Sequence, residues 1–316
     1  MITLKENIPL APFTSFDIGG PARYLAEAAD TDQLREALRL ARERGLPFSI
    51  LGGGTNLLVS DSGFEGLVIR LTCAALRRLG DGIEAEAGAD LTGLVHQAAT
   101  WGLSGLESLA GIPGLVGGAV RGNAGAYGGC IGDACSFVVG LNTETLEITE
   151  IDGADCAFSY RNSRFKQESE FVVISTRLKL TPGPVEEIRQ KNQATLERRA
   201  ARHLECERSV GSFFMNPTVQ DSALIRRFEA DQKAHSREGR IPAGWLIDQA
   251  GLRNLQVGAA QVSARHANYL VNNGGASARD VLALAHIIKE RVLAETGVRL
   301  EEEVSRLGFA AGELLD

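Results

Sequence analysis

The sequence lacks the cysteine and histidine patterns of disulfide frameworks and metal sites. Its five cysteines are an odd set without a Cys-x-x-Cys pair, and its five histidines show neither metal-ligand spacing nor a His-Glu-x-x-His motif. We therefore expect no bound metal and a location in the reducing cytoplasm. The residues concerned are Cys73, Cys130, Cys135, Cys156 and Cys206, and His96, His203, His235, His266 and His286.

An excess of positive charge and long apolar runs are also absent. The chain has 33 Lys and Arg against 40 Asp and Glu, a formal net charge of −7, so it has no general attraction to polyphosphates or anionic membranes. The N-terminal residues lack the apolar core of a signal peptide, and the longest apolar stretch, 109–120, is too short and too glycine-rich to span a bilayer. We expect neither nucleic acid nor membrane insertion.

The composition that is present is that of a water-soluble globular protein. Hydrophobic residues make up 44% and charged residues 23% of the 316 positions. At roughly 150 residues per domain, this length predicts about two domains. The 36 glycines exceed the usual share and cluster, so some loops need backbone without side chains.

Periodicity and capping residues predict the secondary structure. Apolar positions between Asp30 and Gly45, and again between Ser277 and Gly297, predict two amphipathic helices. The order of helix, strand, glycine-rich loop and strand near the N-terminus indicates a mixed sheet. The predicted helices are 31–44, 91–101 and 278–296, with a charged connecting helix at 184–207, and the predicted strands are 48–51, 67–71, 146–151 and 171–180.

Two glycine-rich segments are candidates for binding phosphate. Residues 51–56 read LGGGTN, and residues 111–128 read GIPGLVGGAVRGNAGAYG. Backbone amides without side chains can approach phosphate oxygens, although tight turns also explain such glycines. Neither segment has the G-x-G-x-x-G or the P-loop pattern, so the segments favour a nucleotide or dinucleotide held in another kind of loop.

Three further segments carry candidate reactive groups. Residues 158–166 place Tyr160, Arg161, Arg164 and Lys166 together, which is typical of an anion site or of a solvated strand end. Ser212 follows a glycine and precedes two phenylalanines, but no G-x-S-x-G elbow surrounds it, and a structural serine is the simpler interpretation. Residues 301–303 are three consecutive glutamates, a run that is usually solvated.

Seven segments together resemble the UDP-N-acetylenolpyruvoylglucosamine reductases, flavoenzymes of peptidoglycan precursor synthesis. One such motif is a weak signal, whereas seven in order over nearly the whole chain are specific. The segments are FTSFDIGGPA (13–22), LGGGTNLLVSDSGFEGLVI (51–69), GIPGLVGGAVRGNAGAYG (111–128), YRNSRF (160–165), GSFFMNP (211–217), AGWLIDQAGL (243–252) and LEEEV (300–304).

The resemblance implies an α+β fold with an FAD-binding domain of the p-cresol methylhydroxylase or vanillyl-alcohol oxidase type. This domain, with two α+β subdomains, is expected at 1–183. The connecting helix at 184–207 leads to an α+β substrate-binding domain at 208–316, whose C-terminal segment returns to the active site. The short connection between Lys166 and Gly211 is similar to the family's shorter type, which lacks a tyrosine-loop insertion. The resemblance further implies a monomer.

The family reaction implies roles for individual residues. NADPH reduces noncovalent FAD, which then passes hydride to the enolpyruvyl UDP-sugar. Arg161 matches the arginine that holds the substrate carboxylate, Ser212 the serine that protonates the carbanionic carbon, and Glu303 the glutamate that stabilises the enol. Tyr160 and Asn216 match substrate-binding positions. The residues implied for FAD are Gly52, Gly53, Gly54, Thr55, Asn56, Pro113, Gly117, Gly118, Asn123 and Gly125.

The sequence departs from the family pattern at three positions. Met215 stands where the family usually has Lys or another polar residue, Ser305 where Arg is usual, and Cys130 where Glu is common. One alternative is a flavin oxidase or dehydrogenase of the same fold that acts on an alcohol or sugar. Another, suggested by Met215 and Ser305, is a noncatalytic flavin- or nucleotide-binding protein that has kept the fold and lost its activity.

Overall fold

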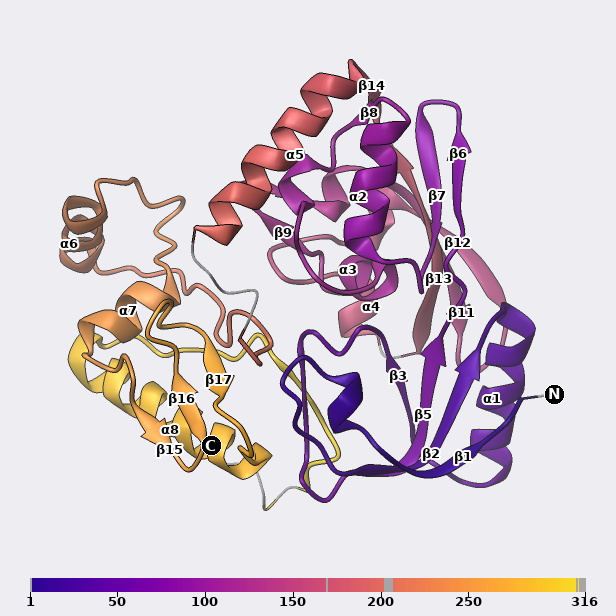
Figure 1. Cartoon of the computed structure of the whole chain (residues 1–316), viewed down its shortest axis with the longest axis horizontal. Helices are drawn as coiled ribbons and strands as arrows, with labels where there is room; N and C mark the ends of the chain where they lie inside the picture. The colour runs from indigo at the N-terminus through magenta and orange to yellow at the C-terminus, as the bar shows by residue number, and fades with distance from the viewer. Residues whose placement is uncertain (1, 169, 202–206, 311, 313–316) are drawn as a thin grey trace. The chain divides into compact units, whose positions relative to one another are not determined.

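The computed structural model describes residues 2–168, 170–201, 207–310 and 312 (Figure 1). These residues form two compact units, each with its own hydrophobic core. The first unit comprises residues 1–8, 22–53 and 65–201, and the second comprises residues 9–21, 54–64 and 202–316. Among the described residues, no helix has both the length and the apolar character needed to cross a membrane.

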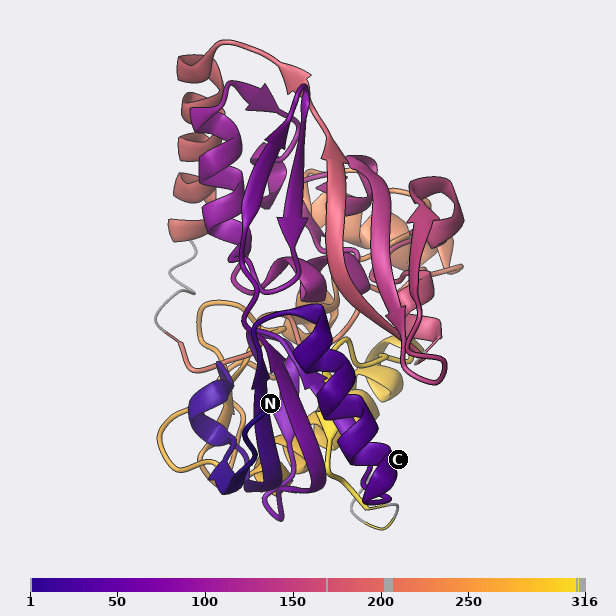
Figure 2. The same ribbon diagram turned by 90° about the vertical axis from the view of Figure 1, so that its right-hand side faces the viewer.

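The first unit contains a four-stranded sheet of order β1-β2-β5-β3, in which β3 and β5 are parallel. Helix α1 packs along this sheet (Figure 2), because Leu34, Ala37, Leu38 and Ala41 lie on one face and are buried in the same core as β2 and β5. The elements are β1 (Lys5–Pro9), β2 (Pro21–Ala28), α1 (Thr31–Glu43), β3 (Phe48–Leu51) and β5 (Phe64–Leu71).

A five-stranded antiparallel sheet of order β12-β11-β13-β7-β6 completes the first unit. Helix α3 lies against β13 and β7, while α2 and α5 lie side by side (Figure 1). The elements are β6 (Leu76–Leu79), β7 (Gly82–Glu86), α2 (Leu91–Thr100), β8 (Leu103–Ser104), α3 (Val116–Arg121), β9 (Gly125–Ala126), β10 (Gly129–Cys130), β11 (Cys135–Asn142), β12 (Ile148–Asp152), α4 (Arg164–Gln167), β13 (Phe171–Lys179), β14 (Thr181–Pro182) and α5 (Val185–Ala200).

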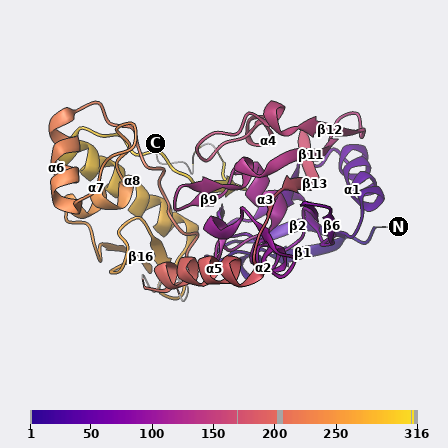
Figure 3. The same ribbon diagram turned by 90° about the horizontal axis from the view of Figure 1, so that it is seen from above.

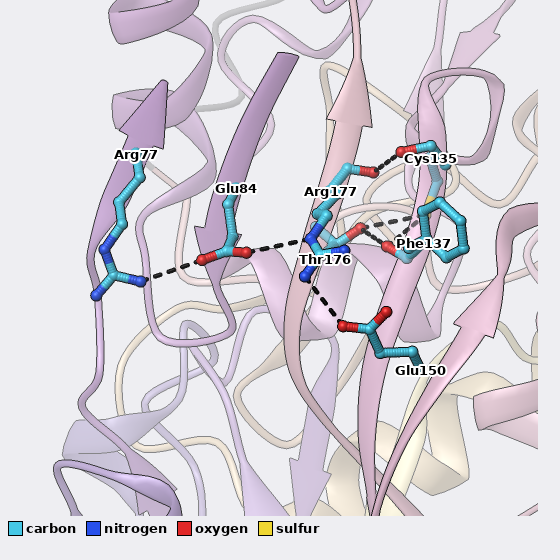
Figure 4. A network of polar contacts seen from close by, with 8 residues as sticks. Arg77, Glu84, Cys135, Phe137, Glu150, Thr176 and Arg177 are labelled. Atoms are coloured by element: carbon cyan, nitrogen blue, oxygen red, sulfur yellow. Dashed lines mark hydrogen bonds and ion pairs between the residues drawn. The ribbon is translucent and has the colours of Figure 1, made fainter. Parts of the chain in front are cut away.

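A row of charged side chains crosses the five-stranded sheet (Figure 4). Glu84 on β7 accepts hydrogen bonds from Arg77 on β6 (3.1 Å) and from Arg177 on β13 (3.3 Å). Arg177 also donates to Glu150 on β12 at 3.0 Å. Because these groups are partly exposed, each pair contributes only about 0.2–1 kcal/mol, and the row mainly favours this strand register.

The second unit combines helices with short strands. A three-stranded antiparallel sheet has the order β15-β16-β17, and β18 pairs in parallel with β4. Helices α7 and α8 lie next to each other (Figure 3), and α8 also contacts β15 and β16. The elements are β4 (Leu57–Val59), α6 (Ser222–Gln232), α7 (Ala243–Gln249), β15 (Gln256–Val257), β16 (Ala260–Val262), β17 (Leu270–Asn272), α8 (Ala278–Thr296) and β18 (Ser305–Leu307).

The two units group some residues differently from the domain boundaries expected from the sequence. Residues 9–21 and 54–64 belong to the second unit, because Phe16 and Leu58 are fully buried in its core. Helix α5 belongs to the first unit, where it contacts α2. The predicted connecting helix at 184–207 is therefore observed as Val185–Ala200, and residues 202–206, including Cys206, lie outside the described residues.

Candidate active site

Within the first unit, the two glycine-rich segments approach each other at Gly53 and Gly114. Strand β3 ends at Leu51, and a Cβ added at Gly53 would lie only 3.1 Å from the Cα of Gly114. By contrast, a Cβ at Gly52 or Gly118 would meet no protein atom within 4 Å. The backbone is therefore close-packed at Gly53 and open at Gly52 and Gly118, which leaves room for a ligand beside bare main chain.

Some amides of these segments have no protein acceptor. The N–H groups of Val116 and Gly117 donate to Ala89 and Ala87, but in the described part of the chain no acceptor is found for those of Gly53 and Gly118. Free amides at a glycine-rich turn and in the first turn of a helix suit phosphate oxygens. These residues therefore fit the pyrophosphate of FAD.

Gly117, which the sequence also predicts as an FAD residue, has a packing role. A Cβ there would lie 2.8 Å from the Cβ of Ala87, so glycine allows α3 to approach the strand side of the unit closely. Pro113 lies in the loop that precedes α3.

Arg161 lies in a tight turn of the first unit. Ser159 and Asn162 exchange backbone hydrogen bonds of 3.0 and 3.1 Å across it, and Arg161 has the left-handed φ of +55°. Its Nη1 donates to the carbonyl oxygen of Gly125 at 2.9 Å, and its Cζ lies 5.7 Å from the ring centroid of Tyr160. The turn thus fixes the direction of the guanidinium group.

Asn123 supports the same turn. It is only 5% exposed, and its Nδ2 donates to the carbonyl oxygen of Ser159 at 2.8 Å while its Oδ1 accepts from the N–H of Gly132 at 3.0 Å. The structure therefore brings Asn123, Gly125, Tyr160 and Arg161 together, and it gives the side chain of Asn123 protein partners.

The two other cations of this segment differ in their surroundings. Nζ of Lys166 donates to the carbonyl oxygen of Arg161 at 2.9 Å, so it stays beside the turn. Nε of Arg164 donates to Glu168 at 2.7 Å, and this hydrogen bond raises the pKa of the Arg164 guanidinium. Arg164 therefore has an internal counter-charge and is the weaker candidate for an anion site.

Gly54, Thr55 and Asn56 belong to the second unit. Gly54 has a φ of +63°, and a Cβ there would lie 1.9 Å from the carbonyl oxygen of Phe13, so only glycine fits. Asn56 donates from Nδ2 to the carbonyl oxygen of Glu303 at 3.1 Å and accepts from the N–H of Ser305 at 3.1 Å. Asn56 thereby joins this turn to the C-terminal segment.

The segment that carries Ser212 is held next to the segment that carries Glu303. The N–H of Glu303 donates to the carbonyl oxygen of Phe213 at 2.8 Å, and the N–H of Met215 donates to that of Glu301 at 2.9 Å. Phe213 and Phe214 are buried, with their rings edge to face at 5.1 Å. Glu303 is thus bonded to Phe213, the residue that follows Ser212.

The glutamate run at 301–303 is not uniformly solvated. The carboxylate of Glu302 is only 11% exposed and forms ion pairs with Lys289 at 2.8 Å and with Arg306 at 2.6 Å. Lys289 belongs to α8, so these pairs connect the run to that helix. The interpretation as a solvated run is therefore wrong for Glu302.

The side chains of Asn216 and Asn268 form hydrogen bonds with main-chain groups. Oδ1 of Asn216 accepts from the N–H of Ala243 at the start of α7 (2.9 Å). Asn268 was not predicted from the sequence, and it bonds both backbone groups of Phe214. The available signal was a polar residue inside the apolar run 267–271, because a buried amide needs partners.

A metal centre finds no support in the described ranges. There, no group of three or more His, Cys, Asp or Glu side chains is arranged to hold a metal ion. The predicted site residues thus form two groups: the glycine-rich backbone and Arg161 in the first unit, and Ser212 and Glu303 in the second.

Comparison with known proteins identifies the family. Residues 22–145 match the FAD binding domain model, and residues 202–307 match the model of the UDP-N-acetylenolpyruvoylglucosamine reductase C-terminal domain. The chain is 40% identical to the UDP-N-acetylenolpyruvoylglucosamine reductase of Carboxydothermus hydrogenoformans, with 96% of this chain and 93% of that protein covered. It is 36% identical to that of Solibacter usitatus, with 97% of each covered.

A solved structure agrees with these matches. The crystal structure of UDP-N-acetylenolpyruvylglucosamine reductase from Thermus caldophilus superposes with a TM-score of 0.78 at 33% identity, over 97% of this chain and 100% of that chain. The expected fold class, an FAD-binding domain plus a reductase C-terminal domain, is confirmed. The chain belongs to the UDP-N-acetylenolpyruvoylglucosamine reductase family.

Proposed function

We infer that the chain reduces the enolpyruvyl group of UDP-N-acetylenolpyruvoylglucosamine to give UDP-N-acetylmuramate for peptidoglycan precursor synthesis. The observation that carries this function is the similarity at 36–40% identity over 96–97% of the chain, with both family domains matched. Bound FAD supplies the acceptor for hydride from NADPH and the donor of hydride to the sugar. The residue roles below are proposals.

We assign the cofactor's pyrophosphate to the bare backbone at Gly52, Gly53 and Gly118. The open space at Gly52 and Gly118 and the available amides of Gly53 and Gly118 support this assignment. Gly54, Thr55 and Asn56 continue the same glycine-rich loop and are assigned to the cofactor with it. Gly117, Asn123 and Gly125 shape the neighbouring backbone.

Arg161 is proposed to hold the carboxylate of the enolpyruvyl group. One nitrogen of its guanidinium donates to Gly125, and a guanidinium is a planar fork of N–H donors that matches the geometry of a carboxylate. Hydride addition builds negative charge on the carboxylate and the adjacent carbon, so an oriented cation stabilises the transition state more than the ground state. Tyr160, beside Arg161, is assigned to substrate binding.

Ser212 and Glu303 are proposed to complete the reduction. The hydroxyl of Ser212 gives a proton to the carbanionic carbon, and Glu303, protonated or sharing a proton, stabilises the enol. The backbone pairing of Phe213 with Glu303 supports their joint action, because it fixes the two segments side by side. Asn216 is assigned to substrate binding in the same segment.

Stopped-flow spectroscopy of the two half-reactions tests these roles. We expect Ser212→Ala to retain FAD and its reduction by NADPH, while anaerobic reoxidation of the flavin by the enolpyruvyl UDP-sugar slows at least about a hundredfold, as for loss of a general acid. Reoxidation at the wild-type rate removes Ser212 from the mechanism. If the unmutated enzyme turns over no enolpyruvyl UDP-sugar at all, the proposed function is wrong.

We also propose that the protein is a monomer, which light scattering after gel filtration tests.

A further inference from the structure

Asn268 makes three hydrogen bonds with the segment that carries Ser212. Its Oδ1 accepts from the N–H of Phe214 at 2.9 Å, and its Nδ2 donates to the carbonyl oxygen of Phe214 at 2.8 Å. Its own carbonyl oxygen accepts from the N–H of Phe213 at 2.8 Å. Asn268 is 1% exposed, so water does not compete for these bonds.

The segment around Ser212 is therefore paired on two sides. On one side Phe213 and Met215 bond to the chain at 301–303, which carries Glu303. On the other side Asn268 bonds to Phe213 and Phe214, and Ser212 forms an antiparallel bridge with Tyr269. The pairing with 301–303 uses main-chain groups alone, whereas the side with Asn268 adds two hydrogen bonds from an amide side chain to its main-chain contacts.

The two side-chain bonds act on the residues that follow Ser212, whereas a glycine precedes it. Gly211, just before Ser212, has a φ of +82° and only one atom, the hydroxyl of Tyr269 at 3.9 Å, near a Cβ placed there. The N–H of Gly211 donates to Oγ of Ser209 at 3.4 Å, but glycine restricts its own backbone least, so the bonds of Phe213 and Phe214 add to what orients Ser212.

We propose that Asn268 is a positioning residue for proton transfer: its amide fixes the main chain at Phe213 and Phe214, and so the hydroxyl of Ser212. This inference rests on the proposed role of Ser212. A displacement of the reacting group by about 1 Å can cost about a hundredfold in rate. Removing the amide should therefore slow the step that uses Ser212 and leave the reduction of FAD by NADPH unchanged.

The test compares two buried asparagines of the second unit in the FAD-loaded enzyme. Asn268→Ala is the test variant, and Asn268→Asp is a second one that keeps the shape and the acceptor for Phe214. Asn272→Ala is the matched control, because Asn272 is 6% exposed and also bonds main chain, donating to Phe16 at 2.9 Å and accepting from Gly274 at 2.8 Å. Each variant is measured for FAD content, thermal unfolding and both half-reactions.

A double-mutant cycle with Ser212→Ala gives a readout that a merely structural role would not move. We expect Asn268→Ala to slow flavin reoxidation by the enolpyruvyl UDP-sugar about tenfold to a hundredfold when Ser212 is present. In the Ser212→Ala background it should slow that step less than about twofold further, because the group it positions is gone. Asn272→Ala should lower the unfolding temperature and leave the ratio of the two half-reaction rates unchanged.

Each other outcome overturns the inference. An equal effect of Asn268→Ala in both backgrounds means that the amide does not act through Ser212. A rate ratio for Asn268→Ala like that of Asn272→Ala means that both amides only stabilise the fold. If both Asn268 variants fail to bind FAD and fail to unfold cooperatively, the amide is needed for folding and not specifically for proton transfer. If Ser212→Ala reoxidises normally, the proposed role of Ser212 fails, whereas failure of Asn268→Ala alone leaves that role intact.

Discussion

The substitution Gly118→Ala should stabilise the apoprotein and weaken FAD binding. Gly118 lies within α3, has no positive φ, and would place its Cβ against no protein atom within 4 Å. Alanine is favoured over glycine in a helix by about 0.5–1 kcal/mol, so the free energy of unfolding of the apoprotein should rise by up to that amount. The same methyl group occupies the space that we assign to the cofactor. We expect the Kd for FAD to rise at least tenfold, which is about 1.4 kcal/mol.

The control for this prediction is Gly93→Ala in α2. Gly93 is also helical, and its added Cβ would lie 3.4 Å from Oδ2 of Asp90, an ordinary contact. It should give the same gain in apoprotein stability without a change in FAD affinity. Urea unfolding of the apoproteins and titration with FAD, followed by flavin fluorescence, measure the two effects. Equal FAD affinities for Gly118→Ala and Gly93→Ala would refute the assignment of this space to the cofactor.

Three further predictions concern one residue each. Arg161→Lys should slow flavin reoxidation by the UDP-sugar at least about tenfold while its reduction by NADPH persists, because a point charge cannot bond Gly125 and bind a carboxylate in parallel; an unchanged rate moves the carboxylate site elsewhere. Gly54→Ala should lower the free energy of unfolding by at least about 2 kcal/mol, since a left-handed φ and a contact of 1.9 Å with Phe13 both oppose it; wild-type stability in urea contradicts this. Asp61→Ala should cost about 1–2 kcal/mol in the same assay, because Asp61 accepts from the N–H groups of Ala278 and Arg279 at the start of α8; a loss below about 0.3 kcal/mol would show that the cap formed by Ser277 suffices.

The departures from the family pattern have different structural settings. The backbone of Met215 keeps its hydrogen bond with Glu301, so the change of side chain leaves this pairing intact. Ser305 begins β18, and its N–H donates to Asn56. Cys130 lies in the hairpin of β9 and β10, where its N–H donates to Asp133.

Local elements were predictable because their signals are local. Asp30 caps α1 and Gly45 follows it with a φ of +61°, as the sequence predicts. The helix predicted between Ser277 and Gly297 is α8, where Ser277 and Asp280 form a capping box and Gly297 follows the last residue. Strand β12 begins at Ile148, later than predicted, because Leu146 takes a left-handed φ of +62° in the turn.

The family and its FAD domain could also be predicted from the sequence alone, because seven short motifs in the same order are specific. Helix α3 was not predicted from the sequence, because its two glycines disfavour a helix. Its formation depends instead on close packing of Gly117 against Ala87.

Only the tertiary structure decided which distant segments pair. The parallel pair of β4 and β18, the hydrogen bond of Arg161 with Gly125, and the bonds of Phe214 with Asn268 join residues far apart in the chain. Such pairings depend on packing of the whole unit and leave no period in the sequence. The sequence by itself determined which residue types the chemistry needs, and the folded chain determined which backbone groups hold each of them in place.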